Sequence, residues 1–115
     1  MSGTEVQLIK HLSNIPAVKT SHGVGEKRVL VANTDTLTNV TQIALTRLKA
    51  GEIAAAHSHL DMEEWFLITE GDINFIIDGV TYHCHKDDFV TISIGSSHEL
   101  HAISDSEIMT IGCQL

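Results

Sequence analysis

The chain has 115 residues, a length that fits one domain and lets it bury roughly two-thirds of the surface of its unfolded state. Its 7 basic and 15 acidic residues give a formal net charge of −8, which argues against binding to nucleic acid or anionic membranes, because both require a basic surface. Two cysteines without close spacing argue against a disulfide framework. Since neither a leader nor an apolar stretch of about 20 residues is visible, we expect a soluble, cytoplasmic protein.

The predicted elements are an irregular start followed by strand after strand. The first 26 residues predict an N-terminal arm, in which residues 6–12 suit a short strand or a helical turn. From there, short apolar runs recur at roughly 8–12-residue spacing, which is typical of an antiparallel sandwich or a closed barrel. Asp78-Gly79 is the strongest hairpin signal. The predicted strands cover residues 28–32, 38–49, 54–59, 64–69, 73–77, 80–85, 89–94, 99–103 and 108–112.

Alternation along these strands predicts a partly polar interior. Over residues 38–49, Gln42 and Thr46 share a face with apolar side chains, because strand side chains alternate with period two. If Gln42, Thr46, Asn74 and Thr91 all point inward, the lining suits a sugar-like or hydroxy-acid ligand better than an aromatic one.

Three histidines and one glutamate form the most informative constellation. His57 and His59 share one face of a predicted strand, Glu64 follows five residues later, and His98 begins a late strand. Glu64 and His98 each lie in phase with apolar residues of their strands. A lone histidine there is most often an ordinary core residue, but a glutamate is almost never buried without a partner, and a cation would be one. Three imidazoles and a carboxylate suit Zn, Fe, Mn, Ni or Cu.

The residues from Gly51 to Gly71 resemble the first conserved motif of the cupin superfamily. That motif is a glycine, five residues, His-any-His, three or four residues, a glutamate, six residues and a glycine. The chain fits it without a spacing error. The six-residue gap before Gly71 selects Glu64 over its neighbour Glu63, a choice that strand parity leaves open.

The second cupin motif is matched less completely. It has Gly-Asp, then Pro-any-Gly and, two residues later, a histidine, which here is His98. Asp87 replaces the first glycine, Ser93 replaces the proline, and Ala102 stands where an asparagine often closes the motif. The turn before His98 is therefore expected to be less rigid.

The resemblance implies an all-β fold, an antiparallel jelly-roll-like cupin barrel (double-stranded β-helix) of six to eight strands. Residues 1–115 would form a single cupin domain with an N-terminal arm (1–26) and a conserved barrel (40–112). His57, His59, Glu64 and His98 would hold one divalent metal, Fe, Mn, Zn or Ni, near the barrel mouth. Such domains often form homodimers and exchange an N-terminal strand, here residues 1–12, and the outward Trp65 and Leu67 fit such an interface.

Three functions fit a cupin metal site. We favour a metal-dependent isomerase, epimerase or lyase acting on a small polar, sugar- or hydroxy-acid-like substrate, with Tyr82, Glu63 and His101 as candidates for the catalytic base. The alternatives are an Fe(II) dioxygenase and a non-catalytic module that binds a small molecule. His83 and His85 could form a second metal pair, but we expect them to face solvent, opposite Val80, Tyr82 and Cys84.

Overall fold

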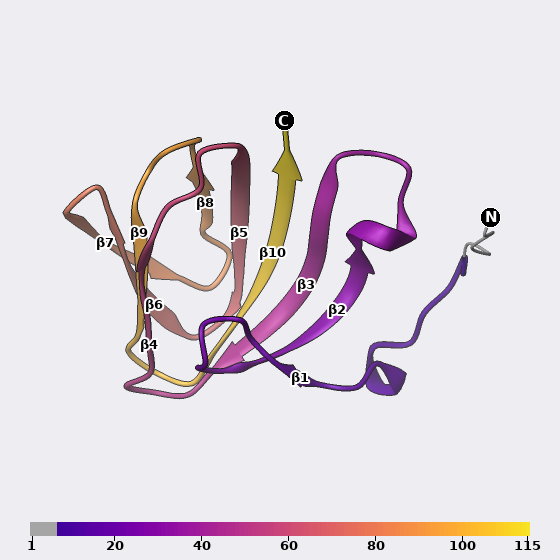
Figure 1. The fold of residues 1–115 in the computed structure, drawn as a ribbon. Coiled ribbons are helices and arrows are strands. Elements are labelled where there is room, and N and C mark those ends of the chain that lie inside the picture. Colours follow the sequence, from indigo (N-terminus) through magenta and orange to yellow (C-terminus); the bar gives the residue numbers. More distant parts are fainter. Residues whose placement is uncertain (1–6) are drawn as a thin grey trace.

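Two antiparallel sheets face each other in the computed structural model, which describes residues 7–115 (Figure 1). One sheet has six strands in the order β1-β2-β3-β10-β5-β8, and the other has four in the order β4-β9-β6-β7. The elements are η1 (Leu12–Asn14), β1 (Val18–Lys19), β2 (Glu26–Ala32), η2 (Asn33–Asp35), β3 (Val40–Leu48), β4 (Ile53–His57), β5 (Met62–Glu70), β6 (Asp72–Ile77), β7 (Val80–His85), β8 (Phe89–Ile92), β9 (His98–Ala102) and β10 (Ser106–Gln114). The predicted all-β, jelly-roll-like barrel is confirmed, with more strands than the six to eight expected from the resemblance.

The core lies between the two sheets, where every second side chain is buried. On β5, β9 and β10 the buried and partly buried positions alternate strictly over the strand centres. Phe66 and Phe75 meet across the sheets with ring centroids 5.4 Å apart, beside the buried Ile68, Ile73 and Ile108. Each such side chain stabilises the fold by about 1.5–3 kcal/mol. The same alternation aims Glu64 and His98 inward.

Strand β4 departs from the predicted alternation. Its register against β9 shifts between Ala54 and His57, as at a β-bulge. Ala54 and His57 therefore both line the interior, while the intervening Ala55 and Ala56 are exposed. The strand ends at His57, so the prediction that His59 shares its strand face was wrong, and His59 lies in the loop before β5.

The N-terminal arm runs along the six-stranded sheet of its own barrel. Strand β1 pairs with β2, and the loop over residues 20–24 lies against the barrel interior. Residues 7–11 form neither strand nor helix, and η1 follows them. Exchange of residues 1–12 between subunits remains a prediction, and residues 1–6 lie outside the described part. Among the described residues, no helix has the length and apolar character needed to cross a membrane.

Candidate metal centre

The structure brings the four predicted ligands together. His57 ends β4, His59 lies in the following loop, Glu64 is on β5 and His98 begins β9, and one donor atom from each lies within 4.8 Å of all the others. Glu64 Oε1 is 3.1 Å from His98 Nε2 and 3.5 Å from His59 Nε2. The four side chains could therefore hold one metal ion between them.

Pairing between β4 and β9 places two of these histidines side by side. His57 and His98 are direct cross-strand partners, and their ring centroids are 4.1 Å apart. Backbone carbonyls contact the Nδ1 atoms, Ala55 O at 3.0 Å from His57 and Ser96 O at 3.5 Å from His98. A proton on Nδ1 of His57, donated to the Ala55 carbonyl, would leave its Nε2 free as a ligand atom.

Glu64 Oε1 and His98 Nε2 are the strongest sign that this cluster needs a cation. Both atoms are buried, and neither makes a hydrogen bond of good geometry within the described residues. Glu64 is 8% exposed and His98 1%, and a buried polar atom without a partner costs about 1–3 kcal/mol. Glu64 Oε1 and His98 Nε2 lie 3.1 Å apart, and either a shared proton or a metal ion would satisfy both atoms. Three imidazoles and a carboxylate form a typical metal-binding set, which favours the metal ion.

The pKa values of the cluster also favour ligation. Burial lowers the pKa of His57 below its ordinary value, against the smaller raising effect of the Ala55 carbonyl. Burial alone would raise the pKa of the Glu64 carboxyl, but contact with His98 and the charges of His98, His59 and His57 outweigh it and hold that pKa below its usual range. At neutral pH the centre therefore presents a neutral imidazole and a carboxylate, the forms that bind metals.

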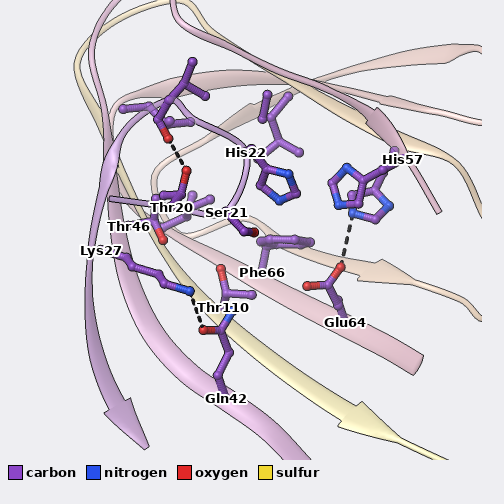
Figure 2. Close-up of a pocket in the computed structure, with 16 residues that line it drawn as sticks. Thr20, Ser21, His22, Lys27, Gln42, Thr46, His57, Glu64, Phe66 and Thr110 are labelled. Atoms are coloured by element: carbon purple, nitrogen blue, oxygen red, sulfur yellow. Dashed lines mark hydrogen bonds and ion pairs between the residues drawn. The ribbon is translucent and has the colours of Figure 1, made fainter. Parts of the chain in front are cut away.

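The cluster borders a cavity of about 70 Å³ between the two sheets (Figure 2). Gln42 and Thr46 line it, as predicted. The condition is not met for Asn74 and Thr91: Asn74 lies on the outer face of β6, in contact with His83, and Thr91 is exposed between two buried residues of β8. The sequence did not show which side chains of these two strands face the interior, because β6 is apolar on both faces near its end and β8 is only four residues long.

Sequence reasoning did not place several further groups in the cavity. His22, Lys27 and Thr110 line it, together with Thr20 and Ser21. The His22 ring lies 4.3 Å from that of His57, and burial is the main reason that its pKa is lowered. Thr110 could have been found from its period-two spacing to Ile108, whereas no local signal shows that the loop at His22 folds back onto the barrel.

The three candidates for a catalytic base lie outside this cavity. Glu63 is exposed, Tyr82 is half exposed on the edge strand β7, and His101 faces away from His98 and contacts Glu99. Their catalytic roles remain predictions without support from this geometry. Val80 and Tyr82, which were expected on the face of β7 opposite His83 and His85, are exposed as well. Only Cys84 on that face is buried, since β7 is an edge strand.

His83 and His85 are exposed, as expected. Their Nδ1 atoms lie 2.5 Å from Asn74 Oδ1 and 2.6 Å from Asp72 Oδ1, respectively. The hydrogen bond with Asp72 raises the pKa of His85. These contacts occupy both rings with partners on β6, and neither histidine belongs to the metal cluster.

Comparison with known proteins gives one family match. A model described as "Cupin domain" matches residues 44–112. No curated protein matches the chain.

Several solved structures share the fold. A predicted oxalate decarboxylase from Thermotoga maritima has a TM-score of 0.85 at 19% identity, covering 94% of this chain and 100% of that one. Ectoine synthase from P. lautus has a TM-score of 0.81 at 19% identity, covering 94% and 78%. A sugar phosphate isomerase from Silicibacter pomeroyi has a TM-score of 0.76 at 17% identity, covering 91% and 74%. Identities this low establish a shared fold and leave the activity open.

Proposed function

The chain belongs to the cupin domain family, and from that premise we propose that it is a metal-dependent enzyme of the isomerase, epimerase or lyase type. Its substrate is a small polar molecule, sugar-like or hydroxy-acid-like. The observation that carries the proposal is the pair of buried atoms, Glu64 Oε1 and His98 Nε2, that face each other at the edge of a polar cavity. The names of the structural neighbours, which include an isomerase and a predicted decarboxylase, are compatible with this class.

The four ligands and the cavity walls have separate tasks. His57, His59, Glu64 and His98 would hold Fe, Mn, Zn or Ni, a range that imidazole and carboxylate donors allow. Such a metal supplies Lewis acidity, which polarises a carbonyl group or lowers the pKa of bound water.

The remaining walls bind and orient the substrate. The hydroxyl groups of Thr46 and Thr110 and the amide of Gln42 can hydrogen-bond to substrate oxygens. Phe66 and Leu100 form apolar walls that keep water from the reacting atoms. His22 packs against His57 and borders the cavity on the side of the N-terminal loop.

Metal analysis of protein purified without added metal tests the site. We expect about one transition-metal ion per chain in the wild type. His57→Ala and Glu64→Gln should lose it, because each removes one of four ligands. His83→Ala and Glu63→Gln are matched controls that should keep it, since both residues are exposed and lie outside the cluster. An apo wild type whose stability is unaffected by His57→Ala would contradict the metal site.

The bound metal and the response to substrates then decide the reaction class. Isomerase, epimerase or lyase turnover of a sugar or hydroxy acid supports the proposal. Stoichiometric Fe(II) with oxygen uptake would replace it with the dioxygenase alternative. Tight binding of a metabolite without turnover, found by thermal-shift screening, would favour the binding module.

A further inference from the structure

Lys27 is a cation inside the same cavity as the metal ligands. It lies on β2, is only partly exposed, and its Nζ donates a hydrogen bond to Gln42 Oε1 over 3.0 Å. Figure 2 shows Lys27 and Gln42 across the cavity from His57 and Glu64, with Phe66 and Thr110 between the two groups. The cavity therefore has a positive group on one side and a metal-ligand cluster on the other.

The charge of Lys27 has no counterion in the described part of the chain. Within residues 7–115, no carboxylate oxygen lies within 4.0 Å of its Nζ. Within these residues, Arg47 is the only lysine or arginine with such a partner, Glu107 at 3.1 Å. Among the described residues the only side-chain partner of this partly buried ammonium is a neutral amide, so its charge is incompletely compensated and an anion would complete it. Lys27 differs from the other lysines and arginines of the described residues in that it lines the cavity.

The surroundings and size of the cavity indicate which anion fits. Thr46 and Thr110 contribute hydroxyl groups to the lining, and these donate to carboxylate oxygens. A volume of about 70 Å³ corresponds to roughly five water-sized groups, at the 10–15 Å³ that one water requires. This space suits a short organic acid.

We propose that Lys27 binds the carboxylate of a short-chain organic acid whose other oxygen-bearing end lies at the centre formed by His57, His59, Glu64 and His98. This assignment rests on the proposed function, because the second end of the ligand is held at the metal. It narrows the substrate to dicarboxylic, keto or hydroxy acids of a few carbon atoms.

Calorimetric titration of the metal-loaded protein with malonate tests the assignment, with the metal content of every variant measured first. Lys27→Gln should weaken malonate binding by about ten- to a hundredfold, the range expected for one charge-assisted hydrogen bond. It should leave metal content and the weak binding of the neutral analogue malonamide unchanged. Lys86→Gln is the matched control: Lys86 is exposed in the turn after β7 and should leave malonate affinity unchanged.

A second variant keeps Lys27 but gives its ammonium group a carboxylate partner within the protein. Gln42→Glu places a carboxylate at the atom that now accepts from Lys27 Nζ, so an internal ion pair should compete with malonate and weaken it by a similar factor. Inorganic phosphate is titrated in parallel, and binding weaker than that of malonate is expected.

The outcomes separate the two proposals. Wild-type protein that binds no metal overturns the proposed function and this assignment together. Full metal content with equal malonate affinity in wild type and Lys27→Gln overturns the assignment alone. Phosphate that binds more tightly than malonate, in a Lys27-dependent way, also overturns it, because the anion would then be a phosphate.

Discussion

At the scale of single residues, the site depends on side chains whose protonation is set by their surroundings. Burial holds His57 neutral; it also opposes ionisation of Glu64, but contact with His98 helps to keep the pKa of that carboxyl below its usual range. The choice of Glu64 over Glu63 followed from the gap to Gly71, and the structure agrees, since Glu64 is buried in the cluster while Glu63 is exposed. Lys27 was one of several cations in the sequence, and only the three-dimensional arrangement shows that it enters the cavity.

The affinity of the centre for metal should depend on pH. A ligating imidazole must be neutral, so protons compete with the metal as pH falls. Because burial lowers the pKa of His57 below its ordinary value of 6.5, this competition should begin below about pH 6 and be absent at pH 8. The pKa of Glu64 is also lowered, so its carboxylate adds to the loss only at still lower pH. Calorimetry with Zn²⁺ at pH 5 and pH 8 checks this, and equal affinities would argue against imidazole ligands.

Asp87 is a residue in a conformation better suited to glycine. Its φ is 74°, in the left-handed region, where an L-residue other than glycine or asparagine costs about 1–2 kcal/mol and aspartate somewhat less. Its backbone N–H donates to Ile68 O over 2.7 Å, which fixes the turn. We expect Asp87→Gly to raise the free energy of unfolding by up to about 1 kcal/mol in urea denaturation, since the hydrogen bond is kept and the strain removed. A loss of stability would show that the Asp87 side chain itself holds the turn.

At the scale of elements, the sequence predicted the strands with strict period-two alternation but not the register shift within β4. The inward faces of β5 and β9 followed from period two, as did the Asp78-Gly79 hairpin, in which both residues have positive φ. The register shift in β4 has no local signal in a run of three alanines. His59 nevertheless lies in the cluster, because the loop after β4 places its side chain there instead of the strand. The spacing of the motif thus predicted the members of the cluster, whereas the assumption that His57 and His59 share one strand face was wrong.

Gly71 is required by the turn that joins β5 to β6. Its φ is 84°, and an added Cβ would overlap the Asp105 carbonyl oxygen and Ser106 Oγ. Gly51 also has a left-handed φ, of 87°, but a Cβ there meets no atom within 4 Å. Gly51→Ala should therefore cost only the conformational strain, about 1–2 kcal/mol, and Gly71→Ala clearly more.

Thermal unfolding of the two glycine variants separates strain from overlap. Each kcal/mol lowers the melting temperature by roughly 4–8 °C in a domain near this size. The difference between the two variants measures the overlap at Gly71. Equal melting temperatures would mean that the turn next to Ser106 relaxes around the added methyl group.

At the scale of the whole molecule, the outer face of the six-stranded sheet lacks the polar character of a solvated surface. Cross-strand pairing places Leu45, Met109 and Leu67 in one row across β3, β10 and β5, and Ile43, Ile111 and Trp65 in the next. All six side chains are only partly buried in a single chain. We call these six residues the outer apolar face. Monomeric proteins seldom leave contiguous apolar patches of this kind in water.

We therefore expect a homodimer that covers the outer apolar face, with the N-terminal arm beside it on the same sheet. An identical partner fits because a twofold axis brings one apolar face against its copy. Since two copies with a net charge of −8 repel each other, burial of apolar surface must drive this association. Leu67→Glu should give a monomer in sedimentation velocity at micromolar concentration, because it places one buried carboxylate per subunit in the interface. Val80→Glu is the control, since Val80 is half exposed on the opposite sheet and should leave the dimer intact.

A monomeric wild type would show that the outer apolar face has another role. A dimer that survives Leu67→Glu would move the interface elsewhere, and the arm over residues 7–26 would then be the next segment to test by truncation.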